Sequence, residues 1–136
     1  MDHAKCVALK LELSSQPEPQ IVPLEAFFDG NDDIASIGCN LLQHPGIQAF
    51  RTTLSGLLTR SDVKAVYAQI SELDPGENFW PFANAVLVLG SIRPEELQTI
   101  VSSLEPDEVG LAEDPSFISP SLSADEKASA LVIFWD

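Results

Sequence analysis

Hydrophobic and polar residues alternate over several stretches of the chain, and a period of two predicts β-strands. In residues 5–13, Val7, Leu9, Leu11 and Leu13 fall on one side of such a strand, and polar or smaller residues fall on the other. This pattern predicts a strand with one buried face. Segments rich in β-branched, aromatic and other apolar residues predict three further strands, at 63–73, 82–90 and 130–136.

Two other segments repeat their apolar residues every three or four positions, which predicts amphipathic helices. The first helix is expected over 45–60, because Pro45 suits a first helical position. Its apolar stripe consists of Ile47, Phe50, Leu54, Leu57 and Leu58. The second helix is expected to begin at Pro94 and to end before Pro106, with an apolar stripe of Leu97, Ile100, Val101 and Leu104.

The order of these elements, β-α-β-β-α-β, predicts an α+β domain with a ferredoxin-like fold. That fold is a four-stranded antiparallel sheet with two helices on one face. Its first connection would be unusually long here, roughly 30 residues against an ordinary loop of a few. Residues 107–124 combine prolines, serines and acids and are expected to be irregular. A length of 136 residues fits one domain, 1–136.

Charge narrows the choice of partners. The chain has 21 acidic residues and 7 basic ones, which gives a formal net charge of −14. Such a chain repels phosphate backbones and anionic lipid surfaces, so neither nucleic acid nor a membrane is an expected partner. The N-terminus does not resemble a cationic signal peptide, and a cytoplasmic protein is expected. In that compartment Cys6 and Cys39 are expected to be free thiols, with Cys6 in the core.

The segment 27–46 holds most of the potentially reactive side chains. These side chains are Asp29, Asp32, Asp33, Cys39 and His44. They could line a pocket between this loop and the sheet that binds a small molecule or a metal. Asp29, Asn31 and Asp33 alternate as the first ligands of a calcium loop do, but the later positions of that template hold Ile34 and Asn40. Turn formation and helix capping are the better explanation of these acids.

Cys39 and His44 could form a thiolate and imidazole pair, because a neighbouring histidine lowers a thiol's pKa. Three nearby aspartates oppose a thiolate, and no Lys or Arg lies between Lys10 and Arg51. Structural roles are therefore favoured for both residues. Paired zinc-ligand spacings and phosphate-binding glycine loops are also missing from the sequence, so no cofactor and no metal is assigned.

Two surfaces could serve a protein partner. The stretch from Pro94 to Asp114 has seven acids and no Lys or Arg, and it forms a plausible docking surface for a basic protein or simply a solvated face. These acids are Glu95, Glu96, Glu105, Asp107, Glu108, Glu113 and Asp114, of which Glu105, Asp107 and Glu108 are the expected contacts. At the tip of the predicted hairpin, Phe79 and Trp80 could provide an aromatic anchor of the kind found in interface hot spots. Equally, these rings could fold back and close the end of the sheet.

Several segments together resemble a group of small, acidic, uncharacterised bacterial proteins. The resemblance rests on PLEAFFDGNDDIASIGCNLLQHPG, on the NFWPF tip, on LEPDEVG and on the terminal FWD. It implies a bacterial source. It implies no activity, cofactor or catalytic residue.

The main hypothesis is a non-catalytic acidic protein-binding module, immunity-like or regulatory, with a basic protein as its partner. The sequence contains no GxSxG, HExxH or CxxC motif, which favours a non-enzyme without deciding the question. The alternative is a small-molecule or metal-dependent function in a pocket under the 27–46 loop. A third possibility is self-association, as a homodimer through the sheet.

Overall fold

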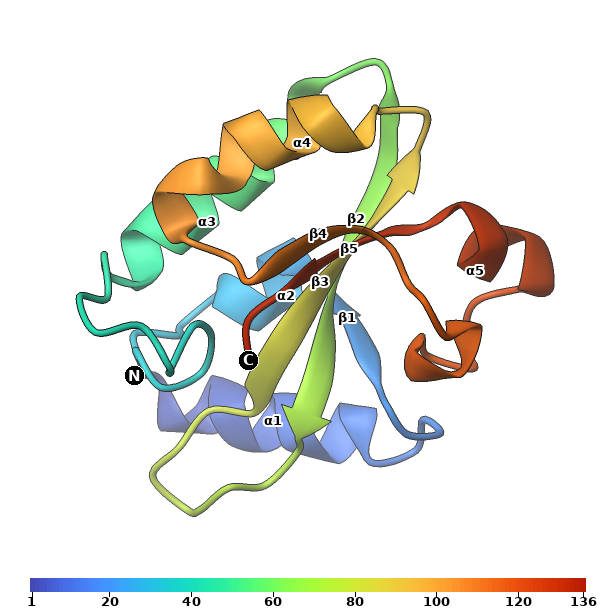
Figure 1. The fold of residues 1–136 in the computed structure, drawn as a ribbon. Helices are drawn as coiled ribbons and strands as arrows, with labels where there is room; N and C mark the ends of the chain where they lie inside the picture. The colour runs from blue at the N-terminus through green and yellow to red at the C-terminus, as the bar shows by residue number, and fades with distance from the viewer.

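The centre of the molecule is a five-stranded antiparallel sheet with the strand order β1-β2-β3-β5-β4 (Figure 1). A computed structural model describes residues 1–136. The long hairpin of β2 and β3 forms the middle, while β1 and β4 form the two edges. The strands are β1 (Ile21–Pro23), β2 (Val63–Glu72), β3 (Phe82–Gly90), β4 (Glu108–Leu111) and β5 (Leu131–Phe134).

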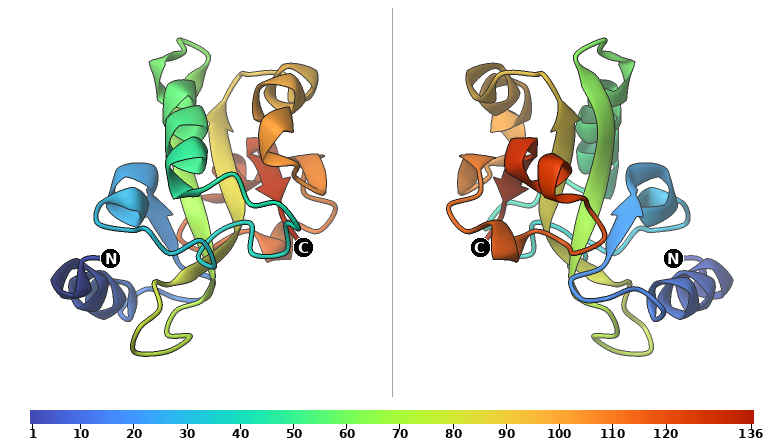
Figure 2. Two further views of the ribbon diagram at one scale, coloured as in Figure 1. Left: turned by 90° about the vertical axis from the view of Figure 1, so that its left-hand side faces the viewer. Right: turned by 90° about the vertical axis from the view of Figure 1, so that its right-hand side faces the viewer.

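Helices cover both faces of the sheet (Figure 2). Two longer helices, α3 and α4, lie on one face, and the short helix α5 lies on the other, whereas α1 lies beside β1 at one end of the sheet (Figures 1 and 2). The helices are α1 (His3–Leu13), α2 (Leu24–Phe28), α3 (Ile47–Gly56), α4 (Pro94–Val101) and α5 (Ala124–Ser129). Three single-turn 3-10 helices complete the fold: η1 (Leu57–Thr59), η2 (Ser102–Leu104) and η3 (Pro115–Phe117). None of the helices combines the length and the apolar character needed to cross a membrane.

The sheet separates two hydrophobic clusters, because alternate side chains of a strand point to opposite faces. On β3, Val86 and Val88 join the larger cluster under α3 and α4. Leu87 and Leu89 join a smaller cluster, which also contains Ile118 from the segment after η3. Both faces of β3 are therefore buried, which explains why its sequence is almost continuously apolar.

The strand predicted over 5–13 is wrong: this segment is the helix α1. The side chain of Asp2 caps the helix by accepting a hydrogen bond from the Lys5 N–H at 3.1 Å. The residues Cys6, Leu9 and Leu13 are buried at helical spacing, whereas Val7 and Leu11 remain 65% and 73% exposed. The apolar residues of this segment fit both the period of two of a strand and the spacing of a helix, and burial follows the helical spacing. Cys6 is in the core, as expected.

The α+β class and the antiparallel sheet are confirmed, as are the helices near 47–59 and 94–104 and the strands β2, β3 and β5. The four-stranded ferredoxin-like arrangement is not what the structure shows, because the sheet has five strands and β1 lies at an edge. The segment predicted to be irregular contains β4, which pairs with β5 from Glu108↔Phe134 to Leu111↔Leu131. Four residues that include a glycine give too weak a local signal to predict this strand.

Candidate functional site

The 27–46 loop closes one end of the sheet. Its backbone joins the sheet where the Ala83 N–H donates to the Ser36 carbonyl at 2.7 Å, beside a bridge between Ile37 and Ala83. Within the loop, the side chain of Asn31 is buried. Its Nδ2 donates to the Ser36 hydroxyl at 2.9 Å and to the Phe27 carbonyl at 3.3 Å. These contacts hold the loop against the sheet.

The three aspartates of this loop have three different partners. Asp29 pairs with the Lys5 ammonium at 2.8 Å, and this hydrogen bond lowers the pKa of its carboxyl group. Asp32 pairs with the amino group of Met1 at 2.8 Å, which likewise lowers its pKa. Asp33 accepts from the Ala35 N–H at 3.0 Å and from the Trp80 N–H at 3.1 Å. The structure therefore does not bring these carboxylates together at one point.

Cys39 and His44 do not form a catalytic pair either. His44 contacts the Ile37 carbonyl through Nε2 at 2.7 Å and accepts from the Gly46 N–H through Nδ1 at 2.9 Å. Because a carbonyl can only accept, these two bonds require a neutral ring protonated at Nε2. The ring also packs on Phe50, with centroids 5.1 Å apart, while Cys39 is exposed. No group of three or more His, Cys, Asp or Glu side chains has a metal-binding arrangement.

The aromatic tip of the hairpin divides into an exposed and a buried ring. Trp80 is fully buried in the larger hydrophobic cluster, so it cannot be the surface anchor that the sequence suggested. Phe79 is 44% exposed and packs edge-on against Phe82. The Cys6 thiol donates to the Phe79 carbonyl at 3.4 Å, and burial raises the pKa of this thiol. Trp80 thus packs inside the molecule, whereas Phe79 remains partly exposed.

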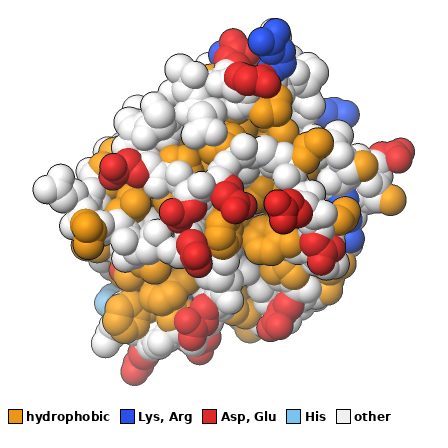
Figure 3. Space-filling model, viewed as in Figure 1, with side chains coloured by type: hydrophobic (Ala, Val, Ile, Leu, Met, Phe, Trp, Pro, Cys, Tyr) orange, Lys and Arg blue, Asp and Glu red, His pale blue; other side chains and the backbone are white.

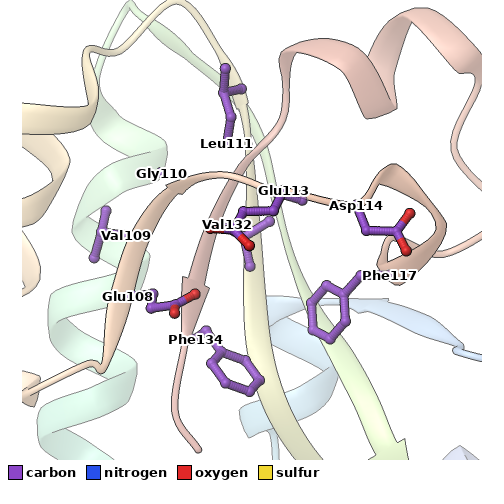
Figure 4. A pocket seen from close by; sticks show the side chains of 10 residues that line it. Glu108, Val109, Gly110, Leu111, Glu113, Asp114, Phe117, Val132 and Phe134 are labelled. Carbon is purple, nitrogen blue, oxygen red and sulfur yellow. The ribbon is translucent and has the colours of Figure 1, made fainter.

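Sequence reasoning did not predict a groove of about 480 Å³ beside β4. Figure 4 shows that β4 and β5 form one side and that the segment leading into η3 forms the other. Its lining residues are Glu108, Val109, Gly110, Leu111, Ala112, Glu113, Asp114, Phe117, Val132 and Phe134. Neither the irregular appearance of this segment nor its short strand signals a groove in the sequence.

Aromatic and small residues make the interior of the groove apolar. Phe117 and Phe134 meet edge-to-face with ring centroids 5.7 Å apart. Gly110 lies opposite Val132 in the β4 and β5 pairing, and a Cβ atom added to this glycine would meet no other atom within 4 Å. Because no side chain projects from Gly110, the groove is open at this point of β4. Leu111 is 61% exposed at its rim.

A buried glutamine holds η3 in place as the opposite wall. Gln69 on β2 donates through Nε2 to the Phe117 carbonyl at 2.9 Å, and its Oε1 accepts from the Ser119 N–H at 2.9 Å. Both Gln69 and Ser119 are almost completely buried. The side chain therefore satisfies two backbone groups of a segment that has no sheet partner of its own.

The rim of the groove is acidic. Figure 3 shows acidic side chains around exposed apolar surface on the face that contains β4, with basic side chains only near the margin of the view. None of the six ion pairs of the protein involves the acids at or beside the groove: Glu105, Asp107, Glu108, Glu113 and Asp114. Asp107 accepts from the Asn40 amide at 3.3 Å and from the Asp136 N–H at 2.6 Å. The Ser116 N–H lowers the pKa of Asp114.

Comparison with known proteins identifies the relatives of this chain. The model of the Uncharacterized protein YfbO family matches residues 4–132. The Uncharacterized protein YfbO of Escherichia coli (strain K12) is 34% identical over 101 residues, which is 72% of this chain and 70% of that protein. No solved structure matches. The expected resemblance to uncharacterised bacterial proteins is confirmed.

Proposed function

The chain belongs to the YfbO family, and we propose that it is a non-catalytic module that binds a basic protein partner through the groove beside β4. The observation that carries this proposal is an apolar groove whose acidic rim has no basic counterpart within the molecule. Of the acids expected from the sequence to meet a basic partner, Glu108 lines the groove, and Glu105 and Asp107 lie just before it in the chain.

The chemistry of the groove suits protein recognition better than catalysis. Interfaces combine an apolar centre with a polar rim, and here Phe117 and Phe134 provide apolar contact while Glu108 and Glu113 provide charge. Unneutralised rim carboxylates attract a basic partner and accelerate its association. The groove contains no His, Cys, Ser or Lys, so it offers no Ser–His or Cys–His pair and no lysine nucleophile.

Binding of a synthetic peptide of alternating lysine and valine tests this proposal at an ionic strength of about 0.1 M, where exposed charges more than about 10 Å apart are largely screened. Charge reversal by Glu108→Lys together with Glu113→Lys is expected to weaken binding at least about tenfold, because attraction becomes repulsion. The matched control is Glu12→Lys with Glu25→Lys, which changes the net charge equally but affects exposed acids on α1 and α2. We expect this control to weaken binding less than about threefold, since distant exposed charges are screened.

Phe117→Ala separates the apolar contribution from the charge. Phe117 is 36% exposed at the groove wall. Removal of its ring is expected to weaken binding of the peptide several-fold, although the rim charges are unchanged. Equal weakening by the two charge-reversal pairs, or no saturable binding of the peptide, would refute the proposed docking surface.

A further inference from the structure

We propose that the free edge of β4 accepts an extended segment of the partner as a sixth strand of the sheet. This inference rests on the proposed function and adds to it the conformation and the chemistry of the bound segment. Edge strands have unpaired backbone N–H and C=O groups, and a peptide can complete them by β-augmentation.

The two edges of this sheet differ in how they are protected. At β1, the Gln16 side chain donates to the Ile21 carbonyl and accepts from the Ile21 N–H, both at 3.1 Å. These are the two bonds that a neighbouring strand would make with one residue. Pro23, at the end of β1, has no N–H to donate. This edge is therefore closed to an incoming strand.

The β4 edge has no such protection. Its only strand partner is β5, and no backbone or side-chain hydrogen bond from outside the sheet reaches the backbone of residues 108–111. No Pro or Lys interrupts the strand, although natural edges commonly carry one of them. In Figure 1, β4 lies in front of the other strands, and no helix crosses before it.

The groove specifies the side chains of the added strand. A segment beside β4 would direct alternate side chains toward the groove, where Phe117 and the uncovered space at Gly110 favour apolar residues. Glu108 at one end of β4 and Glu113 beyond its other end would pair with Lys or Arg. The geometry therefore suits a short extended segment in which apolar and basic residues alternate.

A second copy of this chain suits the edge poorly. Pairing β4 with another β4 would bring the acidic rims of two chains together, each with a net charge of −14. Like charges across an interface oppose association. The occupant we commit to is therefore a basic segment of another protein, and a concentration-dependent dimer that protects β4 without peptide would overturn this choice.

Amide hydrogen exchange, measured with and without saturating lysine and valine peptide, tests strand addition. The β4 N–H groups that do not donate to β5 are expected to exchange at least about tenfold more slowly in the complex, because a neighbouring strand would accept from them. The exposed N–H groups at the start of α1 provide the internal control. Saturated binding with unchanged β4 exchange would overturn strand addition and leave the proposed docking surface standing.

Peptides methylated at alternate backbone nitrogens provide the second test. The two alternative methylation patterns keep every side chain and charge, but each removes the N–H donors along one edge of the peptide. We expect at least one pattern to bind at least about tenfold more weakly than the unmodified peptide. Equal affinity of all three peptides would overturn strand addition, whereas failure of the unmodified peptide to bind would overturn the proposed function itself.

Discussion

Asp33 joins the closing loop to the central hairpin through the backbone of Trp80. One carboxylate oxygen accepts from the Trp80 N–H at 3.1 Å, and the other accepts from the Ala35 N–H at 3.0 Å. The bond to Trp80 joins residues that lie 47 positions apart in the sequence. Asp33, one of the residues spaced like the first ligands of a calcium loop, is thus a structural bridge between the loop and the hairpin.

Replacement of Asp33 by alanine is expected to destabilise the protein by about 1–3 kcal/mol. The change leaves the Trp80 and Ala35 N–H groups without their acceptor, and a bond to a charged group contributes more than a neutral one. Denaturant unfolding measures this loss. Asp32→Ala is the control: its carboxylate is 75% exposed and pairs only with the amino terminus, so a clearly smaller loss of stability is expected. Equal costs would contradict the bridging role.

Replacement of His44 by phenylalanine tests the structural role of this ring. Phenylalanine keeps an aromatic ring beside Phe50 but loses both hydrogen bonds, to Ile37 and Gly46. We expect a loss of about 1–3 kcal/mol in the free energy of unfolding, with His3→Phe on the exposed side of α1 as control.

Zinc titration gives a second measurement on His44. Its Nδ1 lone pair already accepts a hydrogen bond and Nε2 carries the proton, so zinc is expected to give no saturable increase in melting temperature. A saturable increase that His44→Phe abolishes would show that the loop binds metal after all.

Replacement of Gln69 by leucine is expected to loosen η3 and the groove wall. The Phe117 carbonyl and the Ser119 N–H would lose their partner in a buried place, at a combined cost of roughly 2 kcal/mol or more. Faster hydrogen exchange at the Ser119 amide measures the loosening. Gln98→Leu on the exposed side of α4 is the control. Unchanged exchange at Ser119 would mean that other contacts position this wall.

The ion pair of Arg60 with Asp62 predicts a loss of stability in acid. Two hydrogen bonds of 2.9 Å lower the pKa of the Asp62 carboxyl below its usual value of about 4. A lowered folded pKa contributes stability that is present above about pH 4 and is lost as pH falls through the folded value. The free energy of unfolding of Asp62→Asn, measured by denaturant unfolding, should therefore fall less below pH 4 than that of the unchanged protein. Glu12→Gln removes one carboxylate without removing an ion pair and serves as control.

Local periodicity predicted the elements whose burial follows one clear pattern. The stripe of α3 is an example, with Ile47, Phe50 and Leu54 buried at helical spacing. It failed for α1, where alternating and helical patterns overlap and only packing decides between them. It also failed for β4, because this strand depends on pairing with β5, which lies about twenty residues further along the chain.

Charge alone led to the proposal that Glu105, Asp107 and Glu108 meet a basic partner, which stays a prediction. The groove itself could not be predicted, because it combines Phe134 from β5 with Phe117 from η3, which no local motif connects. Trp80 shows the opposite case. Large aromatic residues serve both interfaces and cores, and only the tertiary structure shows that this one is buried.

The most direct test of the proposed docking surface is to map which backbone amide chemical shifts of the protein change when the lysine and valine peptide binds. The account predicts saturable shifts confined to residues 108–117 and to β5, reduced when Glu108 and Glu113 are reversed in charge. It predicts no comparable shifts at β1, whose edge Gln16 closes. Shifts spread over all acidic surfaces, or centred on α1 and β1, would contradict it.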